Sequence, residues 1–323
     1  MKDLYELCHQ LQPTLEKMEI DRRDYKKKQA IFLPISLLVA ATGPIYFFTA
    51  GGGFLSIIAI IIGIASSFAL YHFTAGHLGS AYKRSYKDLV ITKLVNLIDS
   101  GLSYHAESGI SSSTFSESEL YTTVVDRYST EDLIQGDYGN TSLRLAEVHA
   151  EDRRQSRDSK GNSKTTYVTI FQGLFLIADF HKHFQGRTFV FPDKAEKMFG
   201  FLGRKLQKFS GRSGTQLVQL EDTEFEEAFV VHTTDQVEAR YVLSTSMMRR
   251  ILDMRNRFGK DVRMAFKDSS VWLAVPYSSS YLEPTTSVPA TNEIQIQKML
   301  EEIKLFLDTI DELNLNTRIW SKE

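Results

Sequence analysis

The clearest pattern in this sequence is a stretch without charge near its N-terminal end. Residues 29–82 contain no Asp, Glu, Lys or Arg, although these types make up 24% of the chain. Within the stretch, residues 31–50 and 54–73 are mostly apolar, and each is long enough as a helix to cross a hydrocarbon layer of about 30 Å. Three glycines at 51–53 separate them and permit a tight reversal. The pattern predicts a transmembrane hairpin over residues 29–82.

Basic residues flank this predicted hairpin on both sides, while the connecting turn carries no charge. Because positive residues stay on the cytoplasmic side, we expect two spans with both termini in the cytoplasm. The spans have no acid or base at their middle, which favours an anchor over a transporter. The alternative is a buried hairpin inside a large soluble core. The residues expected to contact lipid headgroups are Arg22, Arg23, Lys26, Lys27, Lys28, Lys83, Arg84 and Lys87.

The segments on either side of the hairpin differ in the spacing of their apolar residues. Apolar positions recur every three or four residues between Leu4 and Met18, which predicts an amphipathic helix over residues 1–28. This helix is expected either to pack against a partner segment or to lie on the bilayer. Residues 83–141 are interpreted as a helical connector, and residues 142–323 as a cytosolic domain with a C-terminal helix.

Strand-like segments dominate the first part of that domain. Ser142–Val148 and Thr165–Phe180 are predicted to pair, with the polar segment 151–164 as their connecting loop. Shorter strand candidates follow, and helices are expected in residues 193–209 and 236–258, the latter interrupted near Ser244. Because hairpins adjoin and strand and helix do not alternate regularly, the fold class is α+β with a mainly antiparallel sheet. The shorter strand candidates are residues 187–191, 215–218, 228–233, 262–266 and 271–275.

A helix over residues 293–313 is predicted by apolar residues three and four positions apart. The members of this stripe are Ile296, Met299, Ile303, Phe306, Ile310 and Leu313. Such a stripe packs against its own domain or the N-terminal helix, or forms a coiled-coil dimer. The sequence therefore leaves open whether the protein forms a homo-oligomer.

Composition narrows the classes of function. The net charge is −2, which argues against nucleic-acid binding through overall positive charge. Cys8 is the single cysteine, so neither an intrachain disulfide nor a multi-thiolate zinc site can form. No nucleophile elbow and no phosphate-binding glycine motif occurs in the sequence. We expect no cofactor and no catalytic residue of these classes.

The best metal-like arrangement is Asp179, His181 and His183, because residues two apart on a strand face the same side. Glu147, His149 and Glu151 could mirror it from the paired strand. An ordinary polar strand end is the alternative interpretation. If the residues converge, the protein would be a membrane-attached, metal-dependent hydrolase.

Four segments are more specific than the general pattern of apolar and polar residues. They are residues 163–175 (SKTTYVTIFQGLF), 179–188 (DFHKHFQGRT), 234–241 (TDQVEARY) and 313–320 (LNLNTRIW). Together they resemble a family of bacterial membrane-anchored proteins, domain of unknown function 3137. The resemblance implies a bacterial inner or plasma membrane protein with a cytosolic domain, and supplies no catalytic residues.

These observations favour a membrane-anchored cytosolic binding or regulatory module without catalytic activity. Its expected partners are the lipid bilayer and a protein of unknown identity, with no nucleic acid. The alternatives are the hydrolase described above and a module that senses anionic lipids.

Overall fold

The computed structural model describes residues 4–49, 51–157, 163–180, 184–193, 214–259, 261–277 and 281–313. The chain forms two compact units. The first comprises Met1–Ile98 and Leu282–Leu300, and the second comprises Asp99–Tyr281 and Glu301–Glu323.

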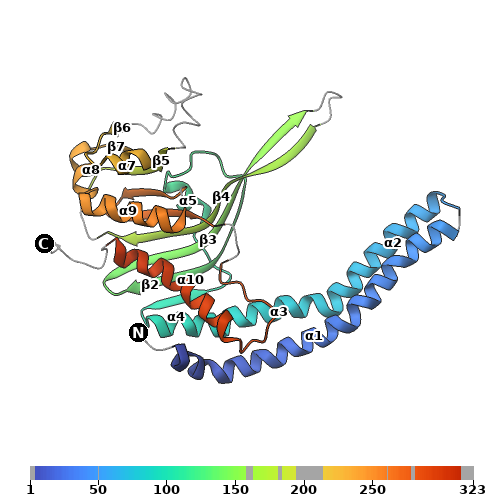
Figure 1. Ribbon diagram of the computed structural model, residues 1–323. Coiled ribbons are helices and arrows are strands. Elements are labelled where there is room, and N and C mark those ends of the chain that lie inside the picture. Colours follow the sequence, from blue (N-terminus) through green and yellow to red (C-terminus); the bar gives the residue numbers. More distant parts are fainter. Residues whose placement is uncertain are drawn as a thin grey trace. The chain divides into compact units, whose positions relative to one another are not determined.

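The first unit is dominated by two long antiparallel helical runs that lie side by side (Figure 1). Helix α1 (Leu4–Thr49) forms the first run. The second run consists of α2 (Phe54–Tyr71), a π-helical turn (His72–Gly76), α3 (His77–Tyr86), a second π-helical turn (Lys87–Ile91) and α4 (Thr92–Ile98). Both helices of the predicted hairpin are therefore present. Between them, Gly51 and Gly52 adopt φ of 78° and 74°, where glycine meets no Cβ penalty.

The sequence predicted a separate helix that ends at residue 28. This boundary is wrong, because α1 continues without a break into the apolar segment. The residues between the two parts support a helix through ion pairs one turn apart. Glu19 pairs with Arg22 and Arg23, and Asp24 pairs with Lys28. Such pairs stabilise a helix where no apolar stripe does. Pro13, Pro34 and Pro44 all lie inside α1.

Small residues bring α1 and α2 close together. A Cβ added to Gly43 would overlap the backbone of Ile60 and lie 2.7 Å from the carbonyl oxygen of Ala59. On the facing helix, a Cβ added to Gly63 would lie 3.4 Å from the Gly43 nitrogen. Close backbone contact through small residues is typical of helix pairs in membranes.

The second unit is built on an antiparallel sheet, so the mixed α+β fold with a mainly antiparallel sheet is confirmed. In the described residues the strand order is β1-β2-β3-β4-β9-β8-β5-β7-β6. The strands are β1 (Leu102–His105), β2 (Arg127–Tyr138), β3 (Thr141–Arg157), β4 (Ser163–Asp179), β5 (Thr188–Pro192), β6 (Gln216–Val218), β7 (Phe229–Thr233), β8 (Arg263–Lys267) and β9 (Ser270–Pro276).

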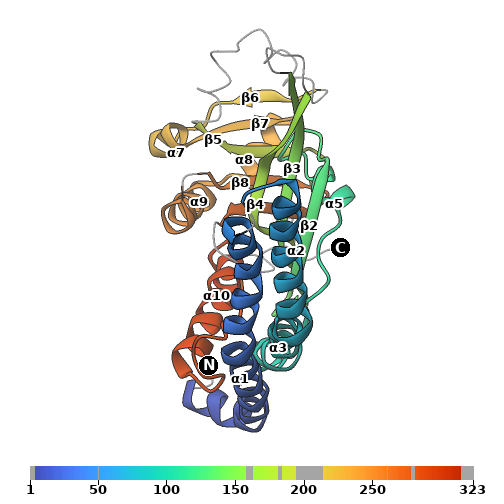
Figure 2. The ribbon, with the colours of Figure 1, turned by 90° about the vertical axis from the view of Figure 1, so that its right-hand side faces the viewer.

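Helices cover both sides of this sheet. Helix α5 (Ser112–Glu117) and helix α9 (Thr245–Phe258) lie on opposite sides of it (Figure 2). On the α5 side, Phe115 stacks on Phe171 and contacts Phe175, which in turn contacts Trp272 edge-on. Among the described residues, the second unit also contains α7 (Thr223–Ala228), α8 (Gln236–Val242) and the last part of α10 (Glu293–Glu312).

Two expectations about this unit are corrected. The helical connector of residues 83–141 ends as a helix at Ile98, and β1 and β2 follow it. The polar loop of residues 151–164 is largely strand, because β3 continues to Arg157 and β4 begins at Ser163. Their outer parts form a hairpin that extends beyond the sheet (Figure 1). Side chains on both faces of this extension are exposed or half-buried, so no apolar alternation marks it as strand.

Several expectations are confirmed. β3 pairs with β4, and β8 forms a hairpin with β9 through Asp268 and Ser269. The interruption expected near Ser244 is present, because α8 ends at Val242 and α9 begins at Thr245, where Ser244 accepts a hydrogen bond from the Met247 amide. The C-terminal helix is present as α10, with the predicted stripe buried. The helix expected over residues 193–209 lies almost wholly outside the described residues.

Candidate functional site

The basic residues that flank the apolar helices do not share one environment. In the first unit, the Arg22 side chain is 13% exposed and forms an ion pair with Glu19 at 2.8 Å. Lys87 is 8% exposed and lies 3.3 Å from Glu283, which also pairs with Lys83 at 2.6 Å. Arg22 and Lys87 therefore have protein partners. The more accessible members of the predicted lipid-contact set are Arg23, Lys26, Lys27, Lys28, Lys83 and Arg84.

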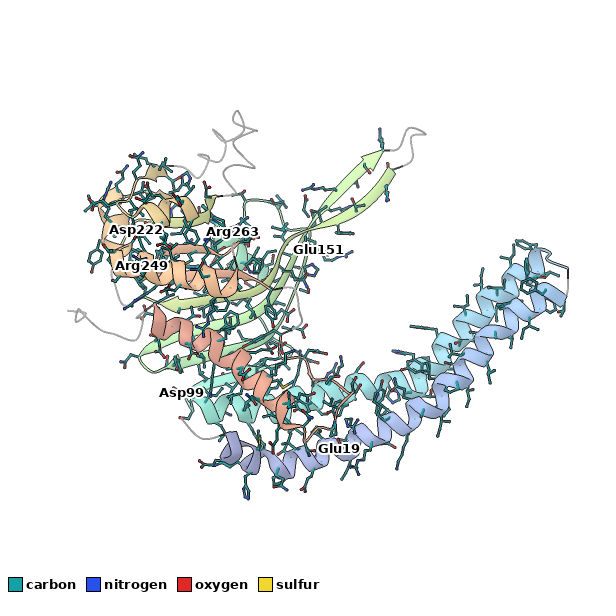
Figure 3. All side chains as sticks on the ribbon, in the orientation of Figure 1. Glu19, Asp99, Glu151, Asp222, Arg249 and Arg263 are labelled. Carbon is teal, nitrogen blue, oxygen red and sulfur yellow. The ribbon has the colours of Figure 1, made fainter. Side chains whose placement is uncertain are left out.

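Glu19 is a buried carboxylate held by several donors (Figure 3). The Nε and Nη2 atoms of Arg22 donate to it, as do the Nε of Arg23 and the backbone amide of Ala290. The hydrogen bonds from Arg22, above all, lower the pKa of Glu19 to about 2. Arg22 also donates to the carbonyl oxygen of Thr286. These contacts join the segment around residues 286–290 to helix α1 within the first unit.

An acidic cluster lies in the second unit, at a β-bulge in strand β2. Glu131 pairs directly with Glu147 across the antiparallel strands, and the register then shifts before Ile134 pairs with Leu145. Asp132, inside this bulge, has φ of 58° and is fully buried. Each of the three carboxylates offers an oxygen, and these oxygens lie within 4.8 Å of one another. In the part of the chain that the structure describes, this is the group of acidic, histidine or cysteine side chains that lie close enough together to hold one metal ion.

Two buried tyrosines adjoin this acidic cluster. The Tyr104 hydroxyl donates a hydrogen bond to Asp132. Tyr281 donates its backbone amide to Glu147 at 2.9 Å, and its side chain is fully buried. Burial, followed by the charges of Glu302 and Asp132, raises the pKa of the Tyr281 hydroxyl. Among the described residues, that hydroxyl has no hydrogen-bond partner.

The residues singled out from the sequence meet the acidic cluster only in part. Glu147 belongs to it. His149 lies 3.9 Å from Glu151 further along β3, and Asp179 pairs with Ser270 at the far end of β4. Glu147 pairs with Leu174, five residues before Asp179, a separation of about 16 Å along a strand. His181 and His183 lie outside the described residues.

Sequence reasoning missed Glu131, Asp132 and Tyr281. Glu131 and Asp132 lie in a region that was interpreted as helical, and their proximity to Glu147 depends on strand pairing and the bulge. Tyr281 lies between the strand candidate of residues 271–275 and the helix predicted from residue 293, where the sequence predicted no helix or strand. The adjacent acidic pair before Leu133 and Ile134 was the available signal.

A second acidic pair has a structural role. Asp235 caps α8 by accepting hydrogen bonds from the amides of Val237 and Glu238. The Glu238 carboxylate in turn accepts hydrogen bonds from the amides of Gln185 and Gly186. Asp235 therefore satisfies amides at the helix start, the ordinary use of an acid there, and Glu238 satisfies backbone donors of a distant segment.

Cys8 lies in a shallow pocket of about 250 Å³ in the first unit. Burial, and secondarily the charge of Glu293, raises the pKa of its thiol. Because the thiolate is the nucleophile, a raised pKa makes this cysteine less reactive. The pocket is lined by Cys8, His9, Gln12, Leu15, Glu16, Thr291, Glu293 and Ile296.

The apolar helices are exposed along most of their length. The segments Cys8–Thr49 and Phe54–Ile98 each contain a window apolar enough to cross a membrane, and only 11% of each window is buried within the protein. Leu38, Phe48 and Phe54 are among the large apolar side chains that are more than two-thirds exposed. This exposure argues against the alternative of a hairpin buried in a soluble core.

Comparison with known proteins finds that part of the chain matches a family whose description assigns no function. Residues 169–315 match the family described as "Protein of unknown function (DUF3137)", so the resemblance seen in the sequence is confirmed over those residues. No curated protein matches the chain. The crystal structure of the mycobacterial trehalose monomycolate transport factor A, TtfA, aligns at 10% identity over 68% of this chain and 92% of that chain. Its TM-score of 0.31 assigns neither fold nor function to this protein.

Proposed function

We propose that this protein is a membrane-anchored binding module, held by α1 and α2 in the bilayer, whose α+β unit acts without catalysis. The observation that carries the proposal is the exposure of two long apolar helices. In water, such a surface would drive aggregation, whereas in lipid it needs no cover. The close approach at Gly43 and Gly63 supports the same environment.

The orientation of the anchor follows from its charges. The basic residues at the two ends of the hairpin remain on the cytoplasmic side, and the uncharged turn at residues 51–53 crosses to the other side. Both termini and the α+β unit are then cytoplasmic, at a bacterial inner or plasma membrane. Arg23, Lys27 and Arg84, which are exposed, face the lipid headgroups.

The non-catalytic part of the proposal is supported by the directions in which pKa values are shifted. The pKa shifts found in the described residues lead away from neutrality: that of Glu19 falls to about 2, and those of Cys8 and the buried tyrosines rise. A general acid or base works best with a pKa near the operating pH. Metal-dependent turnover that is lost on replacing His181 and His183 would overturn this part of the proposal.

Membrane fractionation tests the anchor. We expect the full chain to stay in the membrane pellet after alkaline carbonate and to be released by detergent. Leu38 and Ile61 are 70% and 61% exposed, so arginine at either position would be harmless in water. In lipid, each arginine costs about 3 kcal/mol, and the double variant Leu38→Arg/Ile61→Arg should leave the pellet.

The matched control is Val124→Arg, a substitution at a 76% exposed apolar residue of the second unit. It should fractionate as the wild type does. A wild-type chain that remains in the supernatant without detergent, or a double variant that stays in the pellet, would contradict the anchor.

A further inference from the structure

We propose that the outer part of the β3–β4 hairpin binds the surface of an anionic lipid bilayer. We call this part, residues 153–157 of β3 and 163–169 of β4, the basic ribbon. The inference deepens the proposed function and rests on it, because the anchor is what keeps the basic ribbon near lipid.

The basic ribbon contains four basic residues and no Asp or Glu, although the net charge of the whole chain is −2. In residues 158–162, which connect its two strands in the sequence, Asp158 and Lys160 offset each other. Positive charge is therefore concentrated in this part of the hairpin. The basic residues are Arg153, Arg154, Arg157 and Lys164.

The nearest acids leave most of this charge uncompensated. Glu151 lies 3.3 Å from Arg127 of β2, and Asp152 lies 3.1 Å from Arg154. Among the described residues, the other three basic side chains of the ribbon form no ion pair. Three positive charges are therefore available to an anionic partner.

Strand register places two of these three charges on one face. Arg153 is directly opposed to Tyr167, and Arg157 to Ser163. Directly opposed residues of an antiparallel pair project to the same side, as do residues two apart on one strand. The guanidinium carbon of Arg127 lies 3.6 Å from the centre of the Tyr167 ring. Guanidinium groups beside an aromatic ring with a polar hydroxyl suit the boundary between lipid and water.

Neither face of the basic ribbon is covered by the described residues. It extends beyond the sheet (Figure 1), and its side chains are exposed on both faces. A two-stranded ribbon without an apolar face gains little from packing and is marginally stable by itself in water. Contact with an anionic surface would compensate for this lack of internal packing.

The spacing of the arginines favours an extended surface over one small anion. Arg153 and Arg157 are four residues apart on a strand, which is about 13 Å. Two side chains that project the same way at this separation can contact separate phosphate groups of a bilayer. Arginine binds phosphate through paired hydrogen bonds.

A bilayer is favoured over nucleic acid because the proposed anchor holds the protein at a membrane. Near an anionic leaflet, each Lys or Arg shifts the binding equilibrium by a factor of about five. The attraction of several such residues multiplies, so the three uncompensated charges of the ribbon suffice to hold it at the headgroups.

The test uses the full chain in nanodiscs of neutral phosphatidylcholine, or of the same lipid mixed with anionic phosphatidylglycerol. In a Cys8→Ser background, Thr165→Cys carries an environment-sensitive fluorophore on the face of Arg153 and Arg157. Its emission should rise and shift to shorter wavelength in the anionic discs. High salt should return it to the value in neutral discs, because salt screens the attraction.

Two charge variants separate attraction from folding. Arg153→Gln with Arg157→Gln should lower the ratio of bound to free ribbon by about 25-fold, since two charges are removed. Arg153→Lys with Arg157→Lys retains both charges and should retain the response. Loss of the response in the lysine variant as well would contradict the proposal.

The matched control is Arg249→Gln with Arg257→Gln, which removes two charges from α9 in the same unit. It should respond as the wild type does, and an equal loss in this control would overturn the proposal. A response to double-stranded DNA but not to anionic lipid would overturn it too. So would a full response to inorganic phosphate in neutral discs.

Co-elution of the chain with the nanodiscs separates failure of the ribbon from failure of the anchor. A chain that co-elutes with neither kind of disc contradicts the proposed function. A chain that co-elutes with both kinds, with the same emission in each, contradicts the basic ribbon alone.

Discussion

The Glu19 carboxylate accepts a hydrogen bond from the backbone amide of Ala290 at 2.8 Å, across 271 positions of sequence. Both residues belong to the first unit. Together with the ion pairs to Arg22 and Arg23, this contact fastens a late segment of the chain to α1, ten residues before the charge-free stretch begins at residue 29. The first unit therefore has a polar tie of its own, besides its apolar helix packing.

This tie makes the stability of the first unit dependent on pH. The pKa of Glu19 is lowered from 4.5 to about 2, chiefly by Arg22, so its contribution is fully present above pH 4.5 and is lost as the pH falls toward 2. The contribution is at most about 3 kcal/mol at neutral pH. Glu19→Gln should lower the unfolding midpoint at pH 7, and the difference from wild type should shrink as the pH falls.

The control for this pH effect is Glu16→Gln, an exposed acid one turn earlier on the same helix. Its unfolding midpoint should match the wild type at neutral pH. A Glu19→Gln variant as stable as wild type at pH 7 would show that the tie contributes nothing.

A second prediction concerns the close contact at Gly43. Replacing a helical glycine by alanine ordinarily stabilises a helix by up to about 1 kcal/mol. At Gly43 the added Cβ would overlap the Ile60 backbone, so Gly43→Ala should destabilise by about 1–3 kcal/mol. Gly76→Ala meets only ordinary contacts of 3.6 Å or more and should not destabilise. Thermal unfolding of the two variants in detergent measures the difference, and equal midpoints would refute the close packing.

A third prediction concerns the turn between β8 and β9. Asp268 and Ser269 both have φ of 54°, a conformation that favours asparagine and glycine in two-residue hairpin turns. Asp268→Asn with Ser269→Gly should therefore stabilise the protein by about 1 kcal/mol. Ser270→Gly, at a paired strand position, should instead destabilise it. Chemical unfolding of both variants checks the signs.

The sequence predicted elements best where one face of the element is apolar. The stripe from Ile296 to Leu313 predicted α10, and the strands on either side of residues 267–270 predicted the β8–β9 hairpin. β2 was missed because only its central residues, 132–134, are buried, while the rest of the strand is half-buried or exposed. Without an apolar face, the periodicity carries no signal.

The acidic cluster of Glu131, Asp132 and Glu147 was beyond sequence reasoning for a related reason. Glu131 and Glu147 are 16 positions apart and meet through strand register, and Asp132 joins them only because a bulge adds a residue. The sequence contains the acids, but it does not show the register shift that collects them. Asp179, His181 and His183, by contrast, stand out in the sequence because their spacing is local.

Topology in living cells tests the central claim most directly. In a Cys8→Ser background, Gly53→Cys provides a thiol in the turn between the apolar helices, and Ser142→Cys provides one at an exposed position of the α+β unit. A membrane-impermeant maleimide should label Gly53→Cys in intact cells and label Ser142→Cys only after the membrane is opened. Labelling of Ser142→Cys in intact cells, or protection of Gly53→Cys until lysis, would contradict the account.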